Sequence, residues 1–231
     1  MIRVIKLKPI IGIICVVIFS FVLCLSFNHI ANANVSEYYR YTIVIDPGHG
    51  GWDGGSTGVT TGVTEADLNL KVSKLLKKHL ENFGFNVILT RTSDIALGKN
   101  KVEDMAKRKE IIDKYNPTMV VSIHMNSFTD PSESGTQAYY EDGDDVSKLL
   151  AESIQSQMNL ILPNAREFAN HGEYYILECT SIPTCIVECG FLSNPNDEAL
   201  LNTEDYREKL AYSIYSGIVK YLITAEIATV E

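Results

Sequence analysis

The chain has 231 residues, of which 45% are hydrophobic and 21% charged, so it can bury a core and is too apolar to be intrinsically disordered. Its 29 acidic residues outnumber 20 basic ones, and the net charge of −9 argues against nucleic acid as a partner. None of the five cysteines forms a C-x-x-C pair, which excludes zinc ribbons and thioredoxin-like redox chemistry.

Residues 1–33 have the pattern of an export segment. Three basic residues precede an uncharged apolar run from Pro9 to Phe27, and Ala31 and Ala33 are small residues of the kind that a signal peptidase recognises. The run is also long enough to span a membrane as one helix. We therefore expect either a cleaved signal peptide or a retained membrane anchor over 1–33, a linker over 34–40 and a folded domain over 41–231. Both alternatives place the domain outside the cytoplasm.

The folded domain alternates between strand and helix patterns. In chain order, the pattern predicts a strand at 42–46, a helix at 65–83, a strand at 85–90, a helix at 101–115, strands at 118–124 and 135–141, a helix at 144–160, short strands at about 174–179 and 184–190, and a helix after Thr203. This alternation predicts an α/β fold, a three-layer α/β/α domain with a largely parallel central sheet.

Three cysteines remain once the export segment is set aside. Cys185 and Cys189 lie four residues apart in a predicted strand, about 13 Å at strand rise, and cannot bridge each other. Cys179 would face either of them across a hairpin if 174–179 is a strand. We favour buried, unpaired thiols over a disulfide.

Chemically active side chains gather at the carboxyl ends of the predicted strands. His49 follows the first strand, Glu65 opens the next helix, His124 ends its strand, and Glu188 lies near the end of the final strand. In an open α/β sheet this edge is the usual ligand site. Two imidazoles and two carboxylates in one cleft require a cation, and two His with one Glu form a catalytic zinc set. Asp46, at the end of the first strand, either orients a ligating imidazole or is a structural acid.

Four motifs occur in order along the domain: IVIDPGHGG (43–51), TEADLNL (64–70), VVSIHMNS (120–127) and IVECGFLSNPNDEALL (186–201). Together they resemble the zinc-dependent N-acetylmuramoyl-L-alanine amidases of the Amidase_3 type. The resemblance implies that 41–231 is a catalytic domain that hydrolyses the amide between N-acetylmuramic acid and L-alanine in peptidoglycan. It further implies Zn²⁺ bound by His49, Glu65 and His124, with Glu188 catalytic and Asn126 either behind a metal ligand or beside the substrate.

The small size and the N-terminal apolar segment resemble the sporulation members of this family, which act on spore-cortex peptidoglycan and permit muramic-δ-lactam formation. One departure is Glu178, an acid near the expected site where members often carry Arg. Only 13 residues, 161–173, separate the predicted helix at 144–160 from the next predicted strand, which leaves no room for the occluding helix of some relatives. Control of activity would therefore fall to an accessory protein that the sequence does not identify. The alternatives are a non-catalytic peptidoglycan-binding relative and a zinc peptidase that cuts within the stem peptide.

Overall fold

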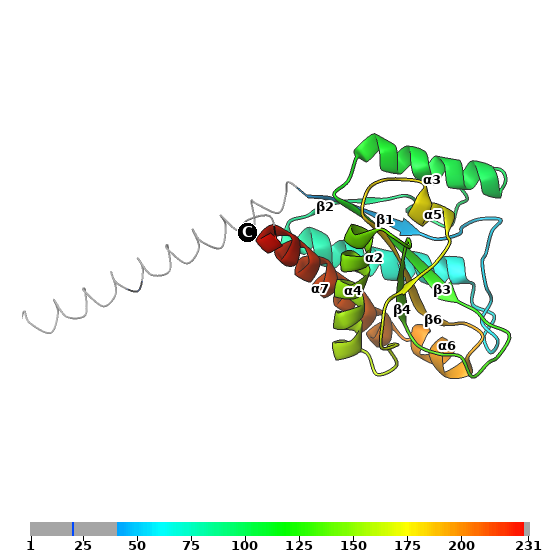
Figure 1. The fold of residues 1–231 in the computed structure, drawn as a ribbon. Coiled ribbons are helices and arrows are strands. Elements are labelled where there is room, and N and C mark those ends of the chain that lie inside the picture. The colour runs from blue at the N-terminus through cyan, green and yellow to red at the C-terminus, as the bar shows by residue number, and fades with distance from the viewer. Residues whose placement is uncertain (1–19, 21–40, 229–231) are drawn as a thin grey trace, which may run out of the picture. The chain divides into compact units, whose positions relative to one another are not determined.

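The computed structural model describes Ser20 and residues 41–228, so the expected export segment and linker lie, apart from Ser20, outside the described residues. Within 41–228, a six-stranded sheet has helices on both faces, which confirms the three-layer α/β/α prediction (Figure 1). No helix in the described part of the chain has the length and apolar character needed to cross a bilayer.

Except at 174–179, the elements follow the predicted alternation, with an additional short strand at 170–171 and an additional helix at 195–201. In chain order they are β1 (Thr42–Pro47), α2 (Glu65–Phe83), β2 (Asn86–Leu89), α3 (Lys101–Tyr115), β3 (Met119–Asn126), β4 (Gln137–Tyr140), α4 (Asp145–Ile161), β5 (Asn170–His171), α5 (Tyr175–Glu178), β6 (Thr184–Phe191), α6 (Pro195–Leu201) and α7 (Glu204–Ala228). The strand order in the sheet is β2-β1-β3-β6-β4-β5. Neighbouring strands run parallel except for β4 against β6, so the carboxyl ends of β1, β3 and β6 meet at one edge.

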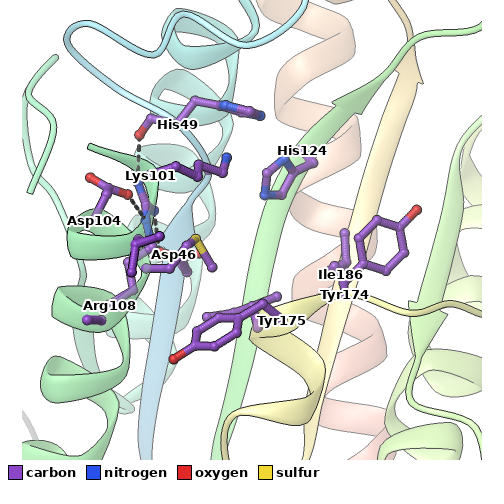
Figure 2. A pocket seen from close by; sticks show the side chains of 14 residues that line it. Asp46, His49, Lys101, Asp104, Arg108, His124, Tyr174, Tyr175 and Ile186 are labelled. Carbon is purple, nitrogen blue, oxygen red and sulfur yellow. Dashed lines mark hydrogen bonds and ion pairs between the residues drawn. The ribbon is translucent and has the colours of Figure 1, made fainter. Parts of the chain in front are cut away.

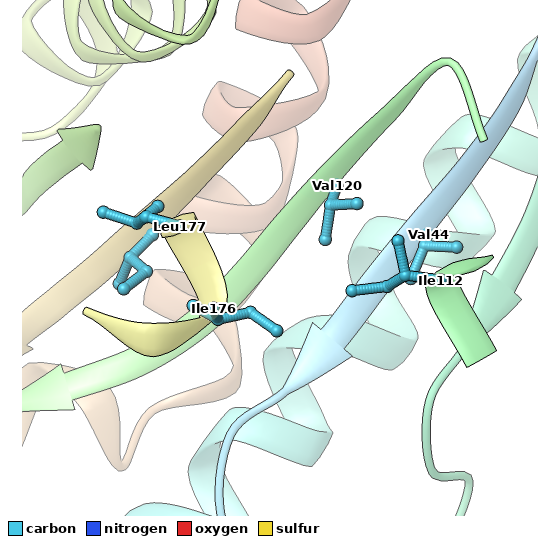
Figure 3. Packing of buried hydrophobic residues seen from close by; sticks show 6 residues of the cluster. Val44, Ile112, Val120, Ile176 and Leu177 are labelled. Atoms are coloured by element: carbon cyan, nitrogen blue, oxygen red, sulfur yellow. The ribbon is translucent and has the colours of Figure 1, made fainter. Parts of the chain in front are cut away.

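The central strands are continuous apolar runs because helices cover both of their faces. All eight residues of β6 are buried. Helices α2, α4 and α7 cover one face of the sheet, and α3 and α5 cover the other (Figure 1). On the α3–α5 side, Ile112 of α3 and Ile176 of α5 pack with Val44, Val120 and Ile186 of the sheet (Figure 3).

The prediction of a strand at 174–179 is wrong, because this stretch forms the short helix α5. Ile176 and Leu177 are adjacent in sequence and both are buried. A strand would direct them to opposite faces, whereas one helical turn lets both pack on the sheet. There is consequently no hairpin that would place Cys179 opposite a partner, and Cys179, Cys185 and Cys189 are free.

Candidate metal centre

His49, Glu65 and His124 come together at the carboxyl edge of the sheet, with one ligand atom of each lying within 4.8 Å of the others. His49 Nε2 lies 3.1 Å and His124 Nδ1 lies 2.9 Å from the same oxygen, Oε1 of Glu65. Figure 2 shows the two imidazoles beside one pocket, His49 on the loop after β1 and His124 on β3. Two imidazole nitrogens and a carboxylate oxygen are the donors that a catalytic Zn²⁺ takes, so the residues fit this ion.

The charges in this cluster favour an ionised Glu65. Burial raises the pKa of its carboxyl, but the contacts with His124 and His49 outweigh burial and hold the pKa well below its usual range. Burial also opposes a charge on His49, yet the carboxylates of Glu65 and Asp53 raise the pKa of that imidazole. The cluster therefore offers a fixed negative charge that would attract a cation.

Glycines let the loop after β1 approach these side chains. A Cβ on Gly48 would lie 2.2 Å from His124 Cε1, and a Cβ on Gly55 would lie 2.5 Å from Glu65 Oε2. His49 itself has a φ of 59°, a left-handed conformation that costs energy in a non-glycine residue. The surrounding contacts must therefore hold the backbone of His49 in place.

Glu188 lies on β6 as the register partner of His124 on β3. Its side chain is buried, and Oε2 has no hydrogen-bond partner in the described structure. Burial, reinforced by the nearby charge of Glu65 and opposed by the two histidines, raises the pKa of Glu188 to about 7. A carboxyl that is free of partners and titrates near neutrality can both accept and donate a proton.

The other expected site residues take different positions. The buried carboxylate of Asp46 accepts hydrogen bonds from Thr90, Ser122 and Arg108. It is linked to His49 indirectly, because Arg108 also donates to the backbone carbonyl of His49. Asn126 ends β3, where its Oδ1 accepts a bond from the backbone N–H of Ser127. Glu178 is exposed at the end of α5 and does not line the pocket that His49 and His124 line.

Two buried arginines, Arg91 and Arg108, hold the Pro47–His49 loop. Neither was among the site residues predicted from the sequence. Arg91 donates to the carbonyls of Pro47 and Gly48 at 3.0 and 2.8 Å. Arg108 donates to the carbonyls of Pro47 and His49 at 2.9 and 2.8 Å, and to the carboxylates of Asp46 and Asp104 at 2.6 and 2.7 Å. The available signal was Arg91 itself, a cation directly after the strand predicted at 85–90.

Replacing Arg108 by Met is expected to lower the free energy of unfolding by about 3–5 kcal/mol, because it leaves two buried carboxylates without their cation. Urea unfolding measures the loss. Lys109→Met, at the adjacent residue, is the control. It breaks only an exposed salt bridge with Asp113 and should leave the midpoint of urea unfolding unchanged. Equal midpoints for wild type and Arg108→Met would contradict the assignment.

The charge of Asp46 should make stability depend on acid pH. Burial raises its pKa, but the charge of Arg108 and the bonds from Thr90 and Arg108 lower it below 3.8. A lowered pKa in the folded state adds stability above pH 3.8, and this is lost as pH falls through the folded pKa. In urea titrations, the deficit of Asp46→Asn relative to wild type should therefore be largest near neutral pH and shrink in acid. A deficit that stays constant down to about pH 2 would contradict this.

A pocket of about 430 Å³ extends from His49 and His124 between α3 and α5. Its wall is mostly apolar and includes Val102. Tyr174 and Tyr175 also line it (Figure 2). The pocket gives a ligand access to the metal-binding side chains from one direction.

Comparisons with known proteins show the family of this chain. A family model described as N-acetylmuramoyl-L-alanine amidase matches residues 43–220. A Bacillus subtilis (strain 168) protein named germination-specific N-acetylmuramoyl-L-alanine amidase is 34% identical over 189 residues, covering 78% of each chain. The structure resembles the CwlD amidase from Clostridioides difficile, solved in complex with the GerS lipoprotein, with a TM-score of 0.76 and 36% identity over 80% of this chain and 99% of that chain. It also resembles an N-acetylmuramoyl-L-alanine amidase from Clostridium difficile 630, with a TM-score of 0.73 and 30% identity over 79% of this chain and 96% of that chain.

Proposed function

From the premise that this chain belongs to the N-acetylmuramoyl-L-alanine amidase family, we propose that it hydrolyses the amide between N-acetylmuramic acid and L-alanine with Zn²⁺ held by His49, Glu65 and His124. The observation that carries the proposal is the cluster of three donor atoms within 4.8 Å. An unpartnered buried carboxylate on the neighbouring strand, Glu188, supports hydrolysis rather than a purely structural metal site.

The reaction needs a proton carrier beside the metal. Bound Zn²⁺ supplies Lewis acidity, which acidifies water and polarises a carbonyl. Glu188 takes a proton from the attacking water and returns it to the nitrogen of the departing L-alanine. Its free Oε2 suits both transfers, because no other group in the described structure competes for that oxygen. The apolar pocket beside His49 and His124 offers space for the substrate flanking the scissile bond.

We further propose that the substrate is spore-cortex peptidoglycan and that removal of the stem peptide leads to muramic-δ-lactam. Support comes from the germination-specific relative in Bacillus subtilis and from the similarity to a CwlD amidase. The latter was solved with a lipoprotein, so an accessory protein is also proposed for this chain. Residues 1–33 would export the domain, as a signal peptide or anchor, with 34–40 as a linker to the catalytic domain over 41–231.

End-group analysis tests the reaction. The zinc-loaded full chain is incubated with purified cortex peptidoglycan, and the newly freed amines are identified. Free L-alanine amines that disappear with chelator and return with zinc support the proposal. Freed amines of other residues would identify a peptidase, and a zinc-loaded protein that binds peptidoglycan without freeing any amine would identify a scaffold; either result overturns the proposal.

A further inference from the structure

We infer that Asp53 is a positioning residue that orients the imidazole of His49 for metal binding, and that Lys101 holds the Asp53 carboxylate in place. The inference rests on the zinc site proposed above. It concerns a residue that lies on the loop after β1 and contacts His49 on the side away from Glu65.

The two ring nitrogens of His49 face different carboxylates. Nδ1 lies 2.9 Å from Asp53 Oδ1, and Nε2 lies 3.1 Å from Glu65 Oε1. A proton on Nδ1 that points to Asp53 leaves the lone pair of Nε2 free for a cation next to Glu65. The Nδ1 contact is close but not aligned as a full hydrogen bond. Hydrogen bonds of catalytic sites are often long or poorly aligned until the substrate is bound, and they tighten in that complex.

Asp53 is itself fixed by contacts with three further residues. Its Oδ1 accepts from the backbone N–H of Gly55 at 3.2 Å, and Lys101 Nζ donates to Oδ2 at 3.2 Å. Its backbone pairs with Gly50 in both directions, at 2.8 and 3.2 Å. Because Lys101 is the first residue of α3, the carboxylate is tied to a helix rather than only to its own loop.

The neighbouring Trp52 ties the same turn to the segment before α3. Its Nε1 donates to the carbonyl of Gly98 at 2.9 Å. The turn that carries Asp53 is therefore held from two directions, and its carboxylate can limit the rotation of the His49 ring. His124 differs, because in the described part of the chain Glu65 is the only carboxylate in contact with its ring.

Zinc affinity of the full chain, purified metal-free, tests the inference. Asp53→Ala should raise the zinc dissociation constant about 10–100-fold, the usual cost of losing a carboxylate behind a metal-binding histidine. Asp53→Asn should raise it less, because the amide oxygen still accepts a bond from Nδ1–H. Lys101→Met should raise it as well, since it frees the Asp53 side chain without removing it.

A spectroscopic measurement separates positioning from a general loss of structure. In zinc-loaded wild type, nitrogen-15 NMR should show a slowly exchanging proton on Nδ1 of His49, and this proton should exchange faster in Asp53→Ala. Asp113→Ala is the matched control, because it removes an exposed carboxylate paired with Lys109 at 2.6 Å, away from the site. The control should bind zinc as wild type does.

The outcomes distinguish this inference from the proposed function. If wild type binds zinc and Asp53→Ala binds it within about twofold, far below the expected cost, the inference is overturned while the zinc site stands. If wild type binds no zinc, the proposed zinc site fails and the inference fails with it. Should Asp53→Ala not fold, the comparison of Lys101→Met with wild type decides by the same criterion.

Discussion

Glu188→Gln is expected to slow amide hydrolysis about 10²–10⁴-fold while the zinc content of the protein stays at the wild-type level. Glutamine has nearly the same shape, so the buried position on β6 stays filled. It cannot accept a proton from the attacking water or pass one to the leaving nitrogen. The three donor atoms of the metal cluster come from other residues and are untouched. Release of L-alanine amines from peptidoglycan and elemental analysis for zinc measure the two quantities.

Glu178→Gln serves as the matched control, since it removes one acid from an exposed position on α5 outside the pocket. It should leave both zinc content and turnover unchanged. Full turnover by Glu188→Gln would remove Glu188 from the mechanism. A loss of zinc in Glu188→Gln would assign this carboxylate to the metal instead of to proton transfer.

His124→Ala is expected to lose most of its zinc and, with it, activity. Catalytic zinc sites use three protein ligands, and this change leaves only His49 Nε2 and the Glu65 carboxylate. It also removes a contact that keeps Glu65 ionised, because the hydrogen bond from His124 is a main cause of the lowered pKa of that carboxyl. Elemental analysis after dialysis against metal-free buffer measures the zinc bound per chain.

His171→Ala is the control for this change, because His171 is an exposed histidine on β5. Its zinc content and turnover should equal those of wild type. Unchanged zinc in His124→Ala would refute the role of His124 as a ligand. A similar loss in both variants would show that the zinc is bound nonspecifically by histidines.

Much of the fold could be predicted because the apolar patterns are long. Continuous β-branched runs indicate strands, and apolar stripes along helices of 17 to 19 residues, such as α2 and α4, indicate one type of element over their whole length. The run at 174–179 is too short for the spacing of its apolar residues to distinguish a strand from a helix. This stretch forms the helix α5 because a helical turn lets Ile176 and Leu177 pack with Val120 and Ile186 of the sheet.

The sequence alone determined which elements alternate and that His49, Glu65, His124 and Glu188 stand where their strands or helix meet the carboxyl edge of the sheet. Parallel strands bring such positions together whatever the details of packing. Only the tertiary structure decided what holds them. Asp53 reaches His49 through a tight turn, and Arg108 reaches the same loop from a helix more than fifty residues away. Contacts of this kind depend on rotamers and loop paths, which leave no periodic pattern in a sequence.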